Sequence, residues 1–534
     1  MIDLLGQRGL PRWPAQAIEP IRSLLTWFRQ ARIGPWRAAV ALLCTVACVG
    51  IILELRSSLI ESLVFSRLTR EMTFHVAAGS SPQIRFPSNG PYDLRLGYAQ
   101  LPVFIRRLSS RDFTVRRQVR LSPRLERLIG SLGYAIFREK AQAGLTIRDR
   151  SGAPLYASRF PERSYQRFDE IPSLVVQTLL FVEDRHLLDS DYPRRNPAID
   201  WNRFSRALLG RIAGLVDPHF RQGGASTLAT QIEKFRHSPN GVTQDSREKL
   251  RQMLMASLRA YQGGPYTGAA RRQIVMTYLN STPLGSRPNY GEVIGIGDGL
   301  WEWYGTEFGL MNGVLSSRPR ARANQVQRAA IYKQVLSLLL AQRRPGYYLV
   351  SPPHALNVLC NSYLQLLAKA GVIDVELRDT ALRLPLEFQS NGPIAKPVSF
   401  VDRKAVDALR AELAALLKVP SLSSLDRLDL AVTSSVDRTA QDRISTLLDR
   451  LSDPLYAKSL GLTGPDLLEA EHPMKVAYSF VLYERGADRN YLRVHADSVD
   501  QPFDINSGAK LILGSTAKLR TLVTYLNIIA ELPS

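Results

Sequence analysis

The sequence predicts a multidomain protein with one transmembrane helix, a small α+β domain, an α-rich domain and part of an α/β domain. Three observations lead to this fold class. An apolar run spans 38–53 after a basic leader, and apolar residues recur every three or four positions from Pro172 to about Pro345. After Leu428, strand-like, helical and strand-like segments follow one another, which is typical of an α/β domain. A chain of 534 residues has room for two or three domains.

The N-terminal region has the pattern of a membrane anchor. Arginines dominate residues 1–37, and the run 38–53 contains no charged residue. Trp36 and Leu55 extend this run toward the ~20 apolar residues that a span needs, which predicts a transmembrane helix over 38–56. A buried core helix is disfavoured because no polar stripe interrupts the run, and a cleaved signal peptide because no small-x-small site follows it directly. The arginines place the N-terminus in the cytoplasm and the bulk of the chain outside.

The composition limits the partners and the chemistry. A formal net charge of +21 favours a nucleic acid, an anionic membrane surface or a phosphate-bearing substrate. No nucleic-acid-binding motif is recognisable, so a basic nucleic-acid-binding protein is only a remote alternative. Cys44 and Cys48 lie in the apolar run and Cys360 is alone outside it, which excludes a disulfide framework. The seven histidines are scattered and form no metal-ligand pattern.

The periodicity also predicts the elements that follow the anchor. Residues 57–145 are expected to form an accessory or pedestal region, with strands at 84–86 and 113–115 and a helix at 101–108. Two short strands about a Ser-Gly turn are expected over 145–156. Helices are then expected at 174–182, 203–216, 249–260, 273–279 and 328–341. The later segments are a helical connector over 346–425, strands at 430–435 and 476–483, a helix at 437–451 and a final helix from Ser515.

Four groups of residues stand in a fixed order between 146 and 345. They are Glu183-Asp184 with Ile199-Asp200 and Arg206-Ala207; Gly224-Ala225-Ser226-Thr227-Leu228-Ala229-Thr230-Gln231-Ile232-Glu233-Lys234; Lys249-Leu250-Arg251-Gln252; and Tyr278-Leu279-Asn280 with Gly285, Tyr290-Gly291 and Trp303-Tyr304-Gly305. In this order they resemble the peptidoglycan glycosyltransferase domain of class A penicillin-binding proteins. The resemblance implies a lysozyme-like helical domain over 146–345 and a membrane-anchored enzyme of the bacterial inner membrane. Its implied substrate is undecaprenyl-pyrophosphate-linked disaccharide-peptide, which it polymerises into cell-wall glycan with inversion, and its bulk is periplasmic.

The resemblance also implies a role for individual residues. Glu183 is the expected catalytic base, because a partly buried carboxylate at a helix end suits proton abstraction; a surface glutamate is the ordinary alternative. The expected substrate-binding residues are Asp184, Ser226, Thr227, Gln231, Lys234, Lys249, Gln252 and Asn280. Hydroxyls and loop N–H groups at a helix start suit a diphosphate, although a plain Ser/Thr helix cap is the alternative for the second motif. Membrane lipids and other cell-wall synthesis or outer-membrane regulatory proteins are the further partners implied.

Departures from the family's pattern leave two functions open. Leu187 replaces an aromatic residue, no histidine stands at the usual spacing, and Gln252 occupies the position of a second carboxylate. A glutamine forms hydrogen bonds but is a poor ligand for the Mg²⁺ or Mn²⁺ that the resemblance allows beside the pyrophosphate. In the first alternative the protein is an active polymerase in which Arg236, Arg247 or Arg251 supplies the missing positive charge. In the second it is a catalytically impaired scaffold or regulator of another cell-wall synthase.

Residues 426–534 resemble the start of the family's transpeptidase domain. Gly514-Ser515-Thr516-Ala517-Lys518 has Ser-x-x-Lys spacing, which places a hydroxyl and an amine on one helix face. The resemblance implies that Ser515 is the acylated nucleophile and Lys518 its base. The partner motifs Ser-x-Asn and Lys-Thr-Gly do not follow before Ser534, so this second activity is expected to be incomplete.

Overall fold

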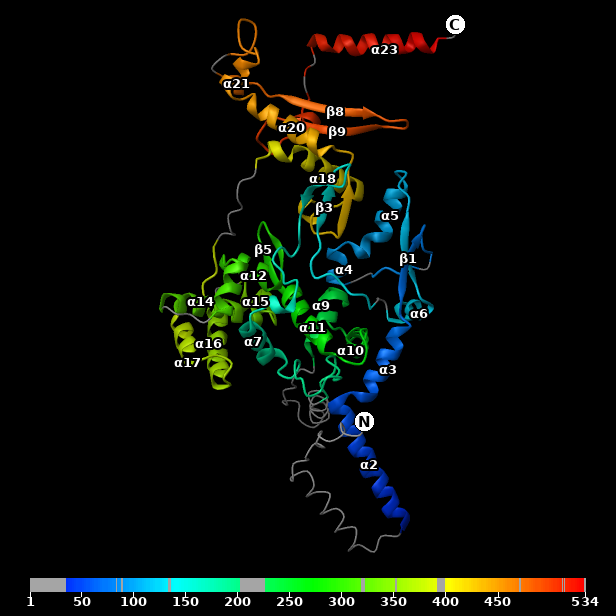
Figure 1. The fold of residues 1–534 in the computed structure, drawn as a ribbon, viewed down its shortest axis with the longest axis vertical. Coiled ribbons are helices and arrows are strands. Elements are labelled where there is room, and N and C mark those ends of the chain that lie inside the picture. The colour runs from blue at the N-terminus through cyan, green and yellow to red at the C-terminus, as the bar shows by residue number, and fades with distance from the viewer. Residues whose placement is uncertain are drawn as a thin grey trace, which may run out of the picture.

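The computed structural model describes most of the chain as an elongated molecule (Figure 1). The described residues are 35–82, 84–87, 90–132, 136–201, 226–317, 322–350, 353–390, 399–469, 472–510, 512 and 514–532. Helix α2 (Pro35–Ser57) lies at one end and helix α23 (Ala517–Glu531) lies at the other. A body of helices and four small sheets lie between them, which is consistent with a multidomain arrangement.

Part of the sequence-based expectation falls outside these ranges. It comprises the basic residues 1–34, the helix expected over 203–216, and the motif residues Arg206, Ala207, Gly224 and Ala225. The anchor itself is described. The stretch Ala39–Ser57 is long and apolar enough to cross a membrane, and none of it is buried inside the protein. This suggests a membrane-anchored protein by length and composition.

The region after α2 forms a small unit of helices and two strands. Its elements are α3 (Leu59–Arg70), β1 (Phe74–Ala78), α4 (Pro91–Arg95), the 3₁₀-helix η2 (Tyr98–Gln100), α5 (Leu101–Ser109), β2 (Arg117–Leu121) and α6 (Pro123–Leu132). β1 and β2 pair antiparallel, with Phe74 opposite Leu121. Met72, Leu125 and Ile129 form a small core there with residues of the helical body.

The structure confirms one of the elements expected in this region and corrects two. The helix expected at 101–108 is confirmed as α5. The strand expected at 84–86 is wrong: Pro82 and Pro87 bracket that run, and neither has a backbone N–H to donate to a ladder. The strand expected at 113–115 is also misplaced, because the residues that pair with β1 begin later, at the start of β2.

A three-stranded sheet joins two segments that are far apart in the sequence. Its strands are β3 (Leu145–Arg148), β4 (Pro154–Ala157) and β7 (Leu430–Thr433), in the order β4-β3-β7. β3 and β4 form the expected hairpin, whereas β7 runs parallel to β3 with Leu430 opposite Leu145. Helices α18 (Lys404–Leu417) and α19 (Leu422–Leu425) share a core with this sheet and with α5.

The main body is a group of helices around one large hydrophobic core. Its elements are η3 (Phe168–Glu170), α7 (Ser173–Glu183), α9 (Leu228–His237), η4 (Pro239–Gly241), α10 (Ser246–Ala260), α11 (Gly268–Ser281), β5 (Pro283–Arg287), β6 (Gly291–Ile294), α12 (Gly295–Tyr304), α13 (Phe308–Ser316), α14 (Arg322–Ala341) and α15 (Pro345–Tyr348). The helices expected at 174–182, 249–260, 273–279 and 328–341 are confirmed. α14 is central, because nearly all of its second half is buried in this core, including Val335, Leu336 and the run Leu338 to Ala341.

The segment expected as a helical connector contributes to two different cores. α16 (His354–Lys369) and α17 (Val375–Arg383) pack against α14, whereas α18 and α19 pack with the three-stranded sheet. Lys333 of α14 is buried, and its ammonium donates to the carbonyls of Ala381 at 3.0 Å and Leu384 at 2.6 Å. A cation at the C-terminal end of a helix is favourable, and this one ties α17 to the body.

The last part of the described chain contains one hairpin and several short helices. Its elements are η5 (Val401–Arg403), α20 (Arg438–Arg450), α21 (Pro454–Ser459), η6 (Pro473–Lys475), β8 (Ser479–Arg485), β9 (Asn490–Asp497), α22 (Ile505–Gly508), η7 (Gly514–Thr516) and α23. The helix expected at 437–451 and the strands expected at 430–435 and 476–483 are confirmed to within a few residues. β8 pairs with β9, and α20 packs on β9.

Candidate active site

The site is built around Glu183, the last residue of helix α7. This helix is buried along Leu174, Val175 and Leu179, and it ends at Asp184, whose backbone is no longer helical. Glu183 therefore lies at the edge of the hydrophobic core, with 9 % of its side chain exposed. A carboxylate in this position contacts both buried donors and any ligand that approaches from solvent.

Three side chains from two other segments hold the Glu183 carboxylate. Gln231 Nε2 donates to Oε2 at 3.0 Å. Gln342 Nε2 and an Arg343 guanidinium N–H both donate to Oε1 at 3.1 Å. Arg343 is 49 % exposed, although it forms an ion pair with a nearly buried carboxylate. Charge-assisted hydrogen bonds are stronger than neutral ones, so these contacts fix the orientation of Glu183.

Helix α9 brings the second motif to this carboxylate. Gln231 and Lys234 are three residues apart, which places them on the same face of the helix, toward Glu183. The hydroxyl of Tyr278, on α11, donates to Gln231 Oε1 at 3.3 Å and fixes the amide from its other side. Burial, together with the negative charge of Glu183, raises the pKa of Tyr278 well above its usual value, so this hydroxyl stays protonated as the donor.

Thr227 has a structural position at the start of α9. Its hydroxyl accepts from the Thr230 N–H, and its own N–H donates to Thr230 Oγ1 at 3.0 Å, which completes a capping box. The same hydroxyl donates to the carbonyl of Ala198 at 3.2 Å, and the residue is 1 % exposed. The structure thus supports the helix-cap alternative for Thr227, and its expected contact with substrate remains a prediction.

Lys234 lies near the carboxylate, and Lys249 lies next to Lys234, in contact with a serine. Lys249 of α10 donates from Nζ to Ser226 Oγ at 2.7 Å. Burial, together with repulsion from Lys234, lowers the pKa of Lys249 to about 8. Burial also lowers the pKa of Lys234, and the negative charge of Glu183 partly opposes this shift. With Arg343, the site holds three cations for one carboxylate, an excess of positive charge that suits a diphosphate.

A buried ionic network supports α9 on its other side. Glu139 accepts from Arg259 and from His237 Nε2, both at 2.7 Å, and from Arg236. His237 Nδ1 lies 3.0 Å from Asp93 Oδ2. Burial alone would raise the pKa of Glu139, but its three cationic partners hold that pKa well below the usual value. Burial opposes the protonation of His237, yet the two carboxylates outweigh it and raise the pKa of His237 to about 9. The network ties the accessory region to α9 and α10.

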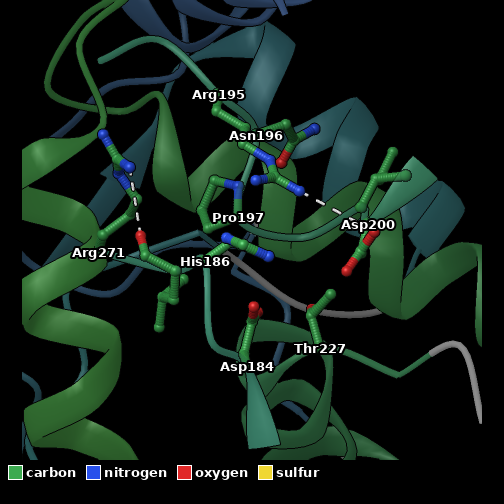
Figure 2. Close-up of a pocket in the computed structure, with 10 residues that line it drawn as sticks. Asp184, His186, Arg195, Asn196, Pro197, Asp200, Thr227 and Arg271 are labelled. Carbon is green, nitrogen blue, oxygen red and sulfur yellow. Dashed lines mark hydrogen bonds and ion pairs between the residues drawn. The ribbon is translucent and has the colours of Figure 1, made fainter. Parts of the chain in front are cut away.

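A small pocket beside Asp184 contains Ile199 and Asp200, the later part of the first motif that the structure describes (Figure 2). Its labelled lining residues are Asp184, His186, Arg195, Asn196, Pro197, Asp200, Thr227 and Arg271. The guanidinium of Arg195 lies 3.9 Å from the carboxylate of Asp200. Arg271 of α11 donates to three carbonyls of the loop that follows α7, at 3.2, 2.7 and 3.2 Å. Asp184 and Asp200 thus line the same pocket.

Gln252 does not take part in the site around Glu183. It is fully buried, and its amide Nε2 donates to Ser238 Oγ at 2.9 Å and Thr243 Oγ1 at 3.0 Å. Ser238 in turn donates to Glu248, so these residues form a polar cluster below the end of α9. Because no part of Gln252 is exposed, this placement gives no support to its expected contact with substrate.

Asn280 also has a structural position. It is 1 % exposed and pairs with both backbone groups of Tyr165, accepting from the N–H at 2.9 Å and donating to the carbonyl at 2.7 Å. These two hydrogen bonds fix the segment that leads into α7. Because both the oxygen and the nitrogen of the amide are hydrogen-bonded, the burial of Asn280 is explained without a bound ligand.

Besides Lys234, the positive charge next to Glu183 comes from Arg343, a residue that the sequence reasoning missed. Arg236 pairs with Glu139, and Arg251 pairs with Glu248. Arg343 occupies the expected role instead, because α14 ends at Ala341 and the chain then passes the carboxylate. A signal was available in the sequence: three polar residues, Gln342, Arg343 and Arg344, follow directly on the apolar end of a long helix.

The second expected site is not enclosed by the described residues. Ser515 lies in η7 and Lys518 in α23, and both side chains are exposed. No residue of α23 is buried, and Figure 1 shows this helix at the far end of the molecule from α2. The structure does not place these two residues in a cleft.

The described residues contain no group of three or more His, Cys, Asp or Glu side chains that could hold a metal ion. Both oxygens of Glu183 are already bound by amides and by Arg343, and a lysine lies beside it. Cations and amide donors around a single carboxylate do not fit Mg²⁺ or Mn²⁺, which prefer several oxygen ligands.

Comparison with known proteins gives one informative result. A search among curated proteins found no match. The family model described as Transglycosylase matches residues 152–349, from the turn between β3 and β4 to just after α15. The matched range contains Glu183, Gln231, Lys249 and Arg343. This match supports assignment of the helical body to a peptidoglycan glycosyltransferase family, and hence a lipid-linked peptidoglycan precursor as its substrate class.

Proposed function

We propose that this protein is a membrane-anchored peptidoglycan glycosyltransferase that polymerises undecaprenyl-pyrophosphate-linked disaccharide-peptide into glycan strands. The observation that carries the proposal is the hydrogen bond between Glu183 and Gln231, which unites the first two motifs across 48 residues of sequence. Helix α2 anchors the chain in the bacterial inner membrane, with the helical body on the periplasmic side.

In the proposed reaction Glu183 is the general base. It takes the proton from the 4-hydroxyl of one lipid-linked disaccharide, and that oxygen attacks the anomeric carbon of the other substrate. The bond from this carbon to the pyrophosphate oxygen breaks, and undecaprenyl pyrophosphate leaves with the electron pair, which inverts the anomeric centre. Lys234 and Lys249 stabilise the negative charge of the leaving pyrophosphate. Arg343 is half-exposed, so it can turn from Glu183 to the pyrophosphate when the substrate enters.

Glu183→Gln tests the proposal. Polymerisation of lipid-linked precursor by the purified full-length chain is measured in membranes or detergent, and the variant should lose at least ~10² of the rate, a typical contribution of a general base. Glu307→Gln is the matched control, because Glu307 is exposed at the start of α13 and lies outside the site. If Glu183→Gln polymerised as fast as the parent, the assignment of Glu183 would be wrong.

A second candidate function is a substrate-binding scaffold or regulator of another cell-wall synthase. It is favoured by Gln252, which replaces a carboxylate of the family's pattern, and by the ion pair that occupies the proposed base. Binding and turnover of lipid-linked precursor, measured on the same preparation, distinguish the two functions. Tight binding without turnover would favour the scaffold, whereas turnover that depends on Glu183 would favour the polymerase.

A further inference from the structure

Helix α3, which follows the anchor, has its polar and apolar sides reversed relative to a surface helix of a water-soluble protein. All of its fully buried residues are small hydroxyl residues at most 4 % exposed: Ser58 just before it, then Ser62, Ser66 and Thr69. Phe65 and Leu68 are half-buried beside them, against the core of the accessory region. Its outward side consists of aliphatic residues that are between 47 and 61 % exposed: Leu59, Ile60, Leu63 and Val64. In water the polar side of a helix faces outward. Small polar residues inside and aliphatic residues outside are typical of a helix in lipid.

Contacts with the helical body fix this orientation. Thr69 Oγ1 donates to the carbonyl of Tyr261 at 3.1 Å, and the Asn196 N–H donates to Ser58 Oγ at 3.1 Å. The ring of Phe65 is stacked on that of Tyr261, with 5.9 Å between the centroids. A rotation that hid the aliphatic side would break all three contacts, so the exposure of that side is a consequence of how α3 is held.

The backbone at the start of α3 is satisfied without water. Ser58 separates α2 from α3 with a left-handed backbone, at φ 51°. The N–H groups of Ile60 and Glu61 then have no helical partner, and both donate to the carboxylate of Glu54, at 2.8 and 2.9 Å. In hydrocarbon each unsatisfied backbone group costs several kcal/mol, whereas in water it costs little. This internal cap is what a helix that begins inside a bilayer requires.

We propose that α3 is a second membrane-contacting element, in which Leu59, Ile60, Leu63 and Val64 lie among the acyl chains beside the exit of α2. The inference rests on the proposed anchor. Figure 1 shows that the chain changes direction between α2 and α3, so α3 leaves the bilayer obliquely. The last turn of the helix carries the exposed Arg67 and Arg70, which reach the level of the lipid phosphates. Arg56, at the end of α2, extends its side chain to the same level.

The occupant of this surface is lipid because of what surrounds it. α3 follows α2 after a single residue, and the residues of α2 are exposed along the proposed span. Basic residues, which anionic lipid attracts, border it on the side away from the span. α3 also contacts α10, the helix that carries Lys249. A membrane-embedded α3 therefore holds the proposed active site at a fixed height above the bilayer, next to a lipid-linked substrate.

Site-directed spin labelling of the full-length chain in phospholipid nanodiscs tests the inference. Cys44 and Cys48 are replaced by alanine, while Cys360 is buried and stays unlabelled. Labels at Ile60→Cys and Leu63→Cys should collide mainly with oxygen, which dissolves in acyl chains. They should be shielded several-fold from the water-soluble nickel complex Ni-EDDA. The melting midpoint of each labelled variant shows whether the label has left the fold intact.

Two further positions make the outcome decisive. A label at Val358→Cys, on the exposed surface of α16, should collide mainly with Ni-EDDA. A label at Val46→Cys reports on the span itself. The inference would be overturned if the labels at 60 and 63 collided with Ni-EDDA as often as the label at 358. It would also be overturned if the labels at 60 and 63 were shielded from both oxygen and Ni-EDDA, because protein would then cover this surface. A water-exposed label at 46 would show that the anchor itself is wrong, a failure separate from that of α3.

Discussion

Lys234 and Lys249 share the same small site, and the charge of Lys234 makes Lys249 harder to protonate. Because burial and this repulsion bring the pKa of Lys249 to about 8, its charge is retained at neutral pH and lost in mildly alkaline solution. An aqueous lysine would stay charged to above pH 10. At the scale of single residues, the pH at which the site loses positive charge therefore depends on how closely its cations are placed.

Affinity for lipid-linked precursor is expected to fall as the pH rises above about 8. The fall should not exceed about tenfold per pH unit, since one proton is involved. Lys249→Arg should keep its affinity to pH 9, because a guanidinium stays charged. Binding isotherms from pH 7 to 9 check this, with Lys369→Arg on the exposed surface as the control. An identical alkaline loss of affinity in Lys249→Arg would exclude Lys249 as its cause.

Gln252→Glu is expected to destabilise the protein rather than to accelerate it. The amide donates to Ser238 and Thr243, and a carboxylate has no proton to replace either hydrogen bond. The new charge would also lie close to Glu248, which accepts from the same Ser238. Loss of buried hydrogen bonds typically costs about 1–3 kcal/mol, and thermal unfolding measures it. The control is Gln244→Glu, at an exposed position. Faster polymerisation with unchanged stability would mean that residue 252 does reach the substrate.

At the scale of elements, the position of α9 decides the site. This helix carries Gln231 and Lys234 on one face, and on its other side it carries Arg236 and His237 into the buried network with Glu139. The accessory region is therefore part of what aligns the active-site face. Its acidic residues neutralise cations that would otherwise be buried without partners, which is a costly arrangement.

The capping role of Thr227 leads to a prediction about α9. Thr227→Ala should lower the free energy of unfolding by about 1 kcal/mol, the usual effect of losing an N-cap, while Thr227→Ser should keep most of it. Precursor affinity of the folded Thr227→Ala protein should stay unchanged, because the hydroxyl is engaged with Thr230 and Ala198. Chemical unfolding and binding isotherms check the two parts. Normal stability with weakened binding would return Thr227 to the substrate site.

His237 should make stability depend on pH. Its folded-state pKa is raised to about 9, above the unfolded value near 6.5. The stabilisation is therefore complete below pH 6.5 and is lost as the pH rises through about 9. The melting midpoint should fall between pH 6.5 and 8. Above pH 8 the lowered pKa of Lys249 acts in the opposite direction, so that range is avoided.

His237→Gln should remove most of this slope while lowering stability at every pH. His354→Gln is the control, because His354 is exposed on α16 and should leave the slope as it is. An unchanged slope in His237→Gln would mean that another group causes the pH dependence.

At the scale of the whole molecule, the arrangement separates the two expected activities. The helical body lies toward α2, whereas α23 lies at the opposite end (Figure 1). Ser515 and Lys518 are exposed, and no residue of α23 is buried against the rest of the described chain. A serine acts as an acylation nucleophile only when an adjacent base and a closed site activate it.

The chain of residues 1–534 is therefore expected not to bind β-lactams covalently. A fluorescent β-lactam followed by gel electrophoresis checks this, with Ser515→Ala as the matched background. Serine-specific labelling of the parent chain would mean that Ser515 and Lys518 are activated by an arrangement other than the one described.

The sequence by itself determined those features that depend on local pattern. The long apolar helix α2 follows from an uninterrupted apolar run, and helices α7, α10, α11 and α14 follow from the 3.6-residue period of their apolar faces. The association of Glu183 with Gln231 and Lys234 was also predictable, because the resemblance assigns all three residues to one site. Local pattern misplaced the strands of the accessory region, since pairing partners and prolines decide where a short ladder begins.

Tertiary structure alone decided which polar residues meet. Gln252 and Asn280 stand in motifs, yet their amides satisfy buried backbone and hydroxyl groups, because an unpaired polar group in the core is costly. Arg343 stands in no motif, yet the end of α14 brings it to Glu183. β7 pairs with β3 across almost 300 residues of sequence, a partnership that no local pattern contains. Distance along the chain carries little information about such contacts, because packing of the whole core determines them.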